Sequence, residues 1–199
     1  MKKFVAICAV MLTVWAVSSP ALATTVTLVP SALNVTPGST VDVSVYMTVN
    51  NPGITMMAIS TNIEYDKNVF TYDDASSVVK GALLTHNWEL YGNEYAEGKS
   101  RVGGIDWDFG ENLAAGSGML FTFTLQVKAD APTGLSAITW GVYDGFDNAT
   151  AGFDYGDENG YDIILLDSEM SGASINVIPE PATMCLLGFG VLGLLRKKQ

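Results

Sequence analysis

Apolar and polar residues alternate with a period of two over several stretches of this chain. In residues 119–128 the odd-numbered positions are apolar, and positions 122, 124, 126 and 128 are Thr, Thr, Gln and Lys. Because successive side chains of a strand point to opposite faces, this pattern predicts a half-buried β-strand. The same alternation predicts strands over residues 41–49, 57–65 and 105–109, the last with Ile105, Trp107 and Phe109 toward the core. Shorter strands are predicted over residues 26–29, 138–143, 163–166 and 174–178.

Turn signals separate these stretches. Residues 36–39 (TPGS), 50–53 (NNPG), 65–68 (YDKN), 115–118 (AGSG) and 131–134 (APTG) are rich in the residue types that form tight turns. No convincing amphipathic helix is found between residues 24 and 178. Many short strands joined by turns in about 155 residues predict an all-β fold, a two-sheet β-sandwich or jelly roll, of which we favour the sandwich.

The two ends of the chain differ from this middle. Residues 1–23 combine two lysines, an apolar run and the small-x-small sequence that ends in Ala21, Leu22 and Ala23, and so predict a signal peptide, a signal helix cleaved by signal peptidase after Ala23. Residues 182–195 form a second apolar run, predicted as a short hydrophobic helix, and Arg196, Lys197 and Lys198 follow it. Fourteen residues span only ~21 Å as a helix, less than the ~30 Å of a bilayer core, which suits transient retention in a membrane. The predicted divisions are therefore 1–23, 24–178 and 179–199.

Charge and cysteine content are also uneven. The whole chain has a net charge of −11, but residues 24–178 hold five basic and 20 acidic residues, a net charge of −15. Such a surface repels phosphate backbones, so nucleic-acid binding is not expected. Both cysteines, Cys8 and Cys185, lie outside the middle, which excludes disulfides and thiol catalysis within it.

Two groups of residues are candidates for catalysis. His86 is the only histidine, and no nucleophile motif accompanies it, so it is interpreted as a surface-loop residue rather than part of a Ser-His-Asp triad. Asp106 and Asp108 are two apart on a predicted strand and would share its polar face. Paired carboxylates can hydrolyse glycosidic bonds, but a solvated strand face is the simpler interpretation. The chain is therefore predicted not to be an enzyme.

Two further groups are candidates for binding. Residues 144–162 are rich in carboxylates and glycines and contain no Lys or Arg, a composition suited to Ca²⁺, for which a solvated acidic loop is the alternative. The candidate Ca²⁺ ligands are Asp144, Asp147, Asp154, Asp157 and Asp162. Trp88, Tyr91 and Tyr95, in a loop-like segment, are candidates for stacking on sugar rings, and ordinary packing is the alternative.

The order of the middle segments resembles the cohesin domain, a β-sandwich that binds dockerins and is related to a superfamily of carbohydrate-binding modules. Residues 63–70 (IEYDKNVF) are similar to the family's L-x-Y-D-P-x-V-L turn, with Lys67 at the proline position. Residues 117–129 (SGMLFTFTLQVKA) are similar to its G-x-L-F-x-I-x-F-x-V strand. The resemblance covers about residues 26–178 and implies a dockerin-bearing protein or a polysaccharide as partner. No dockerin-facing residue is carried over, since those vary widely within the family.

The C-terminal segment resembles the PEP-CTERM sorting signal that exosortases process in Gram-negative bacteria. Pro179, Glu180 and Pro181 match the motif, and the apolar run with its basic end follows in the family's order. The resemblance implies export, transient anchoring in the inner membrane, and delivery to the cell surface or extracellular matrix. We therefore expect a non-enzymatic, exported binding or structural module, with a true cohesin, a carbohydrate-binding module and a glycan-active hydrolase as alternatives.

Overall fold

The structure is a computed structural model. It describes residues 24–50, 54–74, 78–108, 110–141, 153–156, 162–164 and 169–180, and these residues contain no α-helix. The predicted signal helix and C-terminal hydrophobic helix lie outside the described residues. Among the residues that are described, no helix is long and apolar enough to cross a bilayer.

The first sheet has six strands within the described part of the chain. Their order is β15-β1-β3-β11-β6, and β7 also pairs with β11. All pairs are antiparallel except β1 with β15, which is parallel. The bounds are β1 (Thr25–Pro30), β3 (Thr40–Val49), β6 (Phe70–Tyr72), β7 (Val79–Lys80), β11 (Gly116–Val127) and β15 (Met170–Ser171).

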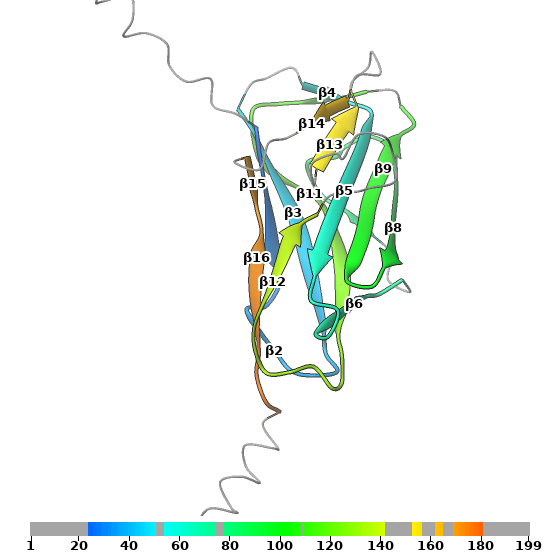
Figure 1. The fold of residues 1–199 in the computed structure, drawn as a ribbon. Helices are drawn as coiled ribbons and strands as arrows, with labels where there is room; N and C mark the ends of the chain where they lie inside the picture. Colours follow the sequence, from blue (N-terminus) through cyan, green and yellow to red (C-terminus); the bar gives the residue numbers. More distant parts are fainter. Residues whose placement is uncertain are drawn as a thin grey trace, which may run out of the picture.

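The second sheet has eight strands in the same residues. One edge of β5 pairs with β9, which in turn pairs with β8, and the other edge pairs with β12 and β13. β14 extends β13, and β16 and β2 extend β12 (Figure 1). The bounds are β2 (Asn34–Val35), β5 (Ala58–Tyr65), β8 (Trp88–Ala96), β9 (Lys99–Asp106), β12 (Gly134–Trp140), β13 (Phe153–Gly156), β14 (Asp162–Ile164) and β16 (Ala173–Val177). A short pair, β4 (Ile54–Met56) and β10 (Glu111–Leu113), lies at one end.

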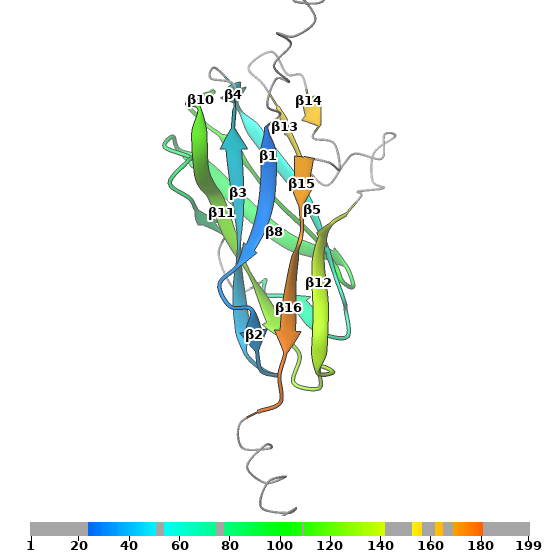
Figure 2. The same ribbon diagram turned by 90° about the vertical axis from the view of Figure 1, so that its left-hand side faces the viewer.

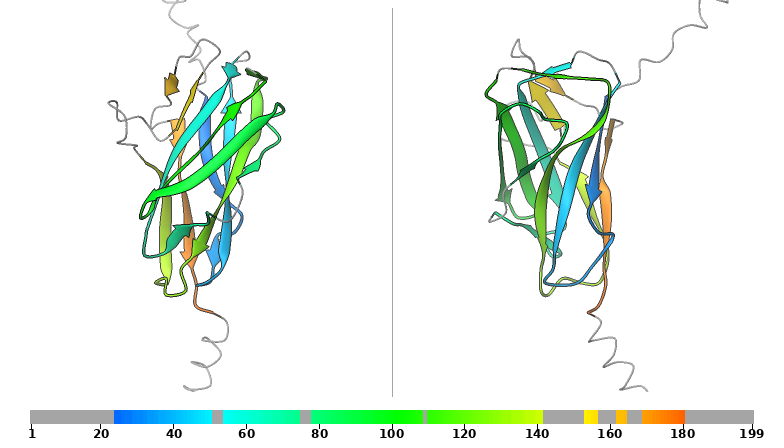
Figure 3. Two further views of the ribbon diagram at one scale, coloured as in Figure 1. Left: turned by 90° about the vertical axis from the view of Figure 1, so that its right-hand side faces the viewer. Right: turned by 180° about the vertical axis from the view of Figure 1, so that it is seen from behind.

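The two sheets face each other (Figure 3), and the buried apolar side chains form one core. The predicted β-sandwich is confirmed. The chain closes the sandwich by changing sheets near its C-terminus, where β15 belongs to the first sheet and β16 to the second (Figure 2). Gly172 lies at this crossing, and a side chain there would approach the carbonyl oxygen of Ile138 to 2.7 Å.

The predicted alternation is confirmed in the central strands of both sheets. In β3 the five odd-numbered residues from Val41 to Val49 are buried, and in β5 Ile59, Ile63 and Tyr65 are buried. In β11 the alternation holds from Phe121 onward. A β-bulge shifts the register between Met119 and Phe121, so Leu120 and Phe121 are both buried and Met119 is only half-buried.

The turn predicted after β5 is also confirmed. Asp66 Oδ1 accepts hydrogen bonds from the backbone N–H of Asn68 (2.8 Å) and from its side-chain amide (3.0 Å). The Asp66 carbonyl accepts from the N–H groups of Val69 and Phe70, both of which are buried in the core. The aspartate therefore closes the turn and returns the chain to the sandwich.

The orientation predicted for residues 105–109 is wrong. Ile105 and Trp107 are exposed, whereas Asp106 is buried, and Phe109 lies outside the described residues. The core-facing positions of β9 are Ser100, Val102, Gly104 and Asp106. Asp106 can face inward because hydrogen-bond donors of the neighbouring segments bind its carboxylate, as described below.

Several strand boundaries also differ from prediction. The segment that holds Trp88, Tyr91 and Tyr95, predicted as loop-like, belongs to β8 (Trp88–Ala96), because it pairs along β9 from Trp88 with Asp106 to Ala96 with Lys99. β12 begins at Gly134 rather than at residue 138. β14 covers Asp162–Ile164, and residues 165–166 of the predicted strand lie outside the described residues.

Candidate functional site

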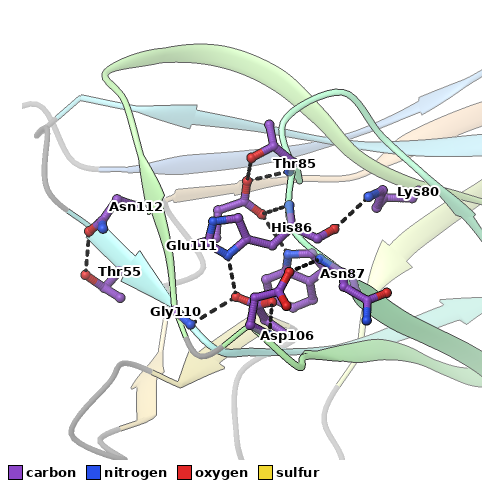
Figure 4. Close-up of polar contacts among 11 residues, drawn as sticks. Thr55, Lys80, Thr85, His86, Asn87, Asp106, Gly110, Glu111 and Asn112 are labelled. Atoms are coloured by element: carbon purple, nitrogen blue, oxygen red, sulfur yellow. Dashed lines mark hydrogen bonds and ion pairs between the residues drawn. The ribbon is translucent and has the colours of Figure 1, made fainter.

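Polar side chains from three segments meet at the end of the sandwich where β9 ends. Thr85 and His86 come from the loop before β8, Asp106 ends β9, and Glu111 begins β10 (Figure 4). The pairing of Trp88 with Asp106 in the β8–β9 ladder brings the loop and the strand end together. We call His86, Asp106, Asp108 and Glu111 the end cluster.

Asp106 fixes the turn that leaves β9. Asp106 is only 1% exposed. Oδ1 accepts from the N–H of Asp108 (3.0 Å), and Oδ2 accepts from the N–H of Gly110 (3.0 Å) and lies 3.0 Å from His86 Nδ1. An ionised carboxylate only accepts hydrogen bonds, so Nδ1 of His86 carries the proton. Three donors therefore hold Asp106 in place.

Glu111 fixes the loop before β8. Its carboxylate is buried and accepts hydrogen bonds from the backbone N–H of Thr85, from the Thr85 hydroxyl (2.6 Å) and from Trp88 Nε1 (2.7 Å). Asp108 also holds this loop, because its Oδ2 accepts a hydrogen bond from the N–H of Asn87 at 2.9 Å. Lys80 Nζ donates to the His86 carbonyl at 2.7 Å. The end cluster thus fastens this loop to the β9–β10 turn.

The surroundings of these groups shift their pKa values. Burial favours the neutral acid and would raise the pKa of Asp106, but the N–H of Asp108, His86 and the N–H of Gly110 outweigh it and lower the pKa. Burial likewise opposes ionisation of Glu111, yet the hydrogen bonds from Thr85 and Trp88 lower its pKa. The hydrogen bond to Asp106 raises the pKa of His86. All three shifts therefore favour the charged form of the group.

Because His86 is the only histidine, its titration can be isolated by mutation. A group whose folded pKa is raised adds stability that is full below its unfolded pKa of about 6.5 and is lost as the pH rises through the folded value. We expect the free energy of unfolding of the wild-type chain to fall as the pH rises above about 6.5, and that of His86→Gln to fall less. Urea unfolding at several pH values measures this. Parallel curves for the two chains would show that His86 does not stabilise the fold through its charge.

The end cluster does not have the arrangement of a glycosidase. Asp106 and Asp108 were predicted to share an exposed strand face. Instead Asp106 is buried with its oxygens bonded, and Asp108 is exposed in the turn. His86, Asp106 and Asp108 each offer a ligand atom within 4.8 Å of the others. Nδ1 of His86 and both oxygens of Asp106 already have hydrogen-bond partners within the fold, which favours a structural role for these groups.

The three aromatic residues predicted to stack on sugars do not form one platform. They lie on β8 rather than in a loop, and the odd spacing of Trp88 and Tyr91 puts them on opposite faces. Trp88 is buried with its indole N–H on Glu111, while Tyr91 is exposed and Tyr95 half-buried. The structure therefore does not place Trp88, Tyr91 and Tyr95 on one surface, and sugar binding by these residues stays a prediction.

The other predicted site residues are only partly described. Asp154 lies on β13 and Asp162 on β14, two strands paired with Gly156 opposite Asp162, and Asp144, Asp147 and Asp157 lie outside the described residues. Pro179 and Glu180 follow β16 and are exposed. The remaining processing residues lie outside the described part of the chain: Ala21, Ala23, Pro181, Arg196, Lys197 and Lys198.

The outward side of β8 and β9 carries apolar side chains. Tyr91, Ile105 and Trp107 are 43%, 44% and 51% exposed. In the ladder Ile105 lies opposite Glu89 and Tyr91 opposite Gly103, and Trp107 Nε1 donates to Glu89 Oε2 at 2.9 Å. We call Glu89, Tyr91, Gly103, Ile105 and Trp107 the β8–β9 face. The hydrogen bond to Glu89 holds the Trp107 ring on this face.

The outward side of the first sheet is different. Its hydroxyl groups bond to one another across the strands, Ser44 with Thr122 and Thr48 with Ser117, each at 2.8 Å. The Thr124 hydroxyl donates to Asp42 Oδ1 at 2.8 Å. Since these groups already have partners, the β8–β9 face is the more suitable surface for binding another molecule.

Family profiles match two parts of the chain. The cohesin domain profile matches residues 26–159, and the profile of the PEP-CTERM protein-sorting motif matches residues 177–199. A search of curated proteins found no sequence match.

Solved structures of cohesins share the fold. A type II cohesin domain from the cellulosome of Acetivibrio cellulolyticus has a TM-score of 0.59 and 16% identity, covering 77% of this chain and 95% of its own. The sixth cohesin of scaffoldin B from the same organism, solved in complex with a Cel5 dockerin, gives 0.55 and 15%, covering 78% and 99%. The seventh ScaB type I cohesin of Pseudobacteroides cellulosolvens gives 0.54 and 19%, covering 77% and 92%.

Proposed function

Because this chain belongs to the cohesin domain family and carries a PEP-CTERM sorting motif, we propose that it is an exported, non-enzymatic binding module that holds a secreted protein partner on its β8–β9 face. The observation that supports this most is the exposure of Tyr91, Ile105 and Trp107 together on the outward side of β8 and the end of β9. Aromatic residues of this kind provide most of the binding energy in many protein interfaces.

The β8–β9 face has the composition of an interface. Its apolar centre is bordered by Glu89 and by Arg101, whose Nε donates to Ser60 Oγ at 3.1 Å on the neighbouring strand β5. An apolar centre with a polar rim is typical of protein–protein interfaces. The surrounding domain carries −15, so a partner with complementary positive charge would associate faster.

We propose a dockerin-bearing protein as this partner. The support is family membership, together with a cohesin relative solved in complex with a dockerin. A polysaccharide ligand is less well supported, since Trp88 is turned inward and cannot extend an aromatic platform with Tyr91. The sorting motif supports export and membrane association, and we propose display at the cell surface or in the extracellular matrix as the destination.

A direct titration tests the choice of partner. The full chain is titrated by calorimetry with a set of Ca²⁺-loaded dockerins and, separately, with soluble polysaccharides. We expect a dockerin to bind with a Kd of about 1 μM or tighter, with affinity that weakens as salt is added. Heat from a polysaccharide alone would indicate a carbohydrate-binding module instead, and no heat from any dockerin would contradict the proposal.

A further inference from the structure

Three exposed apolar side chains gather where the described chain leaves the sandwich. Leu33, Leu135 and Ile178 are 67%, 77% and 37% exposed. Leu135 of β12 lies opposite Asn176 of β16, and the N–H of Asn176 donates to the Leu33 carbonyl at 2.8 Å. The N–H of Ile178 donates to the Val35 carbonyl at 2.8 Å. These backbone contacts bring the segments that carry Leu33, Leu135 and Ile178 together at one end of the sandwich, and we call the three residues the exit corner.

The exit corner lies at the end of the sandwich opposite the end cluster. Figure 2 shows β2 and the ends of β16 and β12 together at the lower end, with β4 and β10 at the upper end. The strands of the second sheet run between these ends, so the β8–β9 face lies along the side of the molecule.

The distance from this corner to the apolar C-terminal run is short. Only Pro179, Glu180 and Pro181 separate Ile178 from residue 182, where the apolar run begins. Four residue steps of fully extended chain span at most about 14 Å. The headgroup layer on one side of a bilayer is about 5–7 Å thick. If residues 182–195 enter the hydrocarbon, Ile178 cannot stand far above the lipid headgroups.

The charge of this end also suits a lipid surface. The segments 31–39, 128–135 and 174–180 contain one basic residue, Lys128, and two acidic residues, Asp130 and Glu180. The mature domain as a whole carries −15, and an anionic membrane would repel most of its surface. The exit corner is thus an apolar and nearly neutral part of a strongly acidic domain.

From these observations we propose that the exit corner rests on the phospholipid surface that holds the chain's own C-terminal run, so that the domain stands upright on the membrane until the tail is processed. Leu33, Leu135 and Ile178 enter the headgroup layer. The β8–β9 face then remains along the side, open to a partner. This proposal rests on the membrane association included in the proposed function.

The experiment uses the exported chain, residues 24–199, with Cys185→Ser so that one introduced cysteine can be labelled. Thr133→Cys places a fluorophore beside Leu135, and Ala115→Cys, also at an exposed turn residue, places it at the opposite end, between β10 and β11. The chain is inserted into phosphatidylethanolamine–phosphatidylglycerol vesicles whose lipids carry a nitroxide on the headgroup. We expect several-fold stronger quenching at position 133 than at position 115.

A second variant tests the role of the apolar side chains themselves. The triple substitution Leu33→Ser, Leu135→Ser and Ile178→Ser is expected to weaken quenching at position 133 several-fold, while the chain still floats with the vesicles. Equal quenching at positions 133 and 115, or no effect of the triple substitution, would overturn the proposal. A further control uses vesicles without nitroxide lipid. If the fluorescence at position 133 then falls as more chains are inserted per vesicle, a second copy of the chain lies at the exit corner, and the proposal is overturned. Failure to float would overturn the membrane association as well, whereas the dockerin titration would be unaffected.

Discussion

Replacing Glu111 with Ala is expected to lower the free energy of unfolding by about 3–5 kcal/mol. The substitution leaves the buried Trp88 indole N–H without its acceptor, and it also removes the hydrogen bonds that the N–H and the hydroxyl of Thr85, an exposed residue, donate to the charged carboxylate. A buried donor left unsatisfied costs about 1–3 kcal/mol, and the loss of hydrogen bonds to a charged group costs about 1.5–3 kcal/mol. Urea unfolding near neutral pH, where the carboxylate is ionised because its pKa is lowered, measures the loss.

Two controls accompany this substitution. Glu89→Ala also removes a glutamate bonded to a tryptophan indole, but at an exposed site, so we expect a loss below about 1 kcal/mol. Glu111→Gln keeps one acceptor oxygen and is expected to lie between the two, which keeps the test usable if the alanine variant does not fold. A loss for Glu111→Ala equal to that for Glu89→Ala would show that the end cluster does not stabilise the fold.

The sandwich was predictable because its central strands each have one face in the core. β3 and β5 place alternate residues inward, and that difference is visible as a period of two in the sequence. The 66–69 turn was predictable for a similarly local reason, since Asp66 bonds to residues two to four positions further along.

The orientation at the end of β9 was not predictable from the same pattern. Ile105 and Trp107 are apolar but exposed, and Asp106 is polar but buried, so a rule that places apolar residues inward gives the wrong face. The burial of Asp106 depends on His86, 20 positions earlier, and on the N–H of Gly110. Contacts between segments distant in the sequence leave no periodic signal.

That single error concealed both parts of the site. With Trp107 turned inward, Tyr91 is the one aromatic residue left on the β8–β9 face, and with Asp106 turned outward, the end cluster does not exist. The weak alternation of residues 88–96 added to the difficulty, since Gly92 and Glu94 occupy inward positions of β8. The sign available in the sequence was the spacing of Ser100, Gly104 and Asp106. They occupy alternate positions, so Asp106 lies on the same side of the strand as the small residues that face the core.

The central claim is that the β8–β9 face binds the partner, and Trp107 is the residue on which it depends most. About half of its surface is exposed, and the hydrogen bond to Glu89 fixes its ring before binding, so little side-chain entropy is lost in the complex. Removing such an anchor from an interface costs about 2 kcal/mol or more. The fold should be little affected, because the ring does not contribute to the core.

The most direct test compares two exposed aromatic residues, one on each sheet. Tyr46 on β3 is 40% exposed, compared with 51% for Trp107, but it lies on the hydroxyl-rich side of the first sheet, which makes Tyr46→Ala the control for Trp107→Ala. The Kd of the full chain for a Ca²⁺-loaded dockerin is measured by calorimetry for the wild type and for both variants. We expect Trp107→Ala to raise the Kd at least about tenfold and Tyr46→Ala to leave it unchanged. An unchanged Kd for Trp107→Ala, or a larger effect of Tyr46→Ala, would contradict the assignment of the binding face.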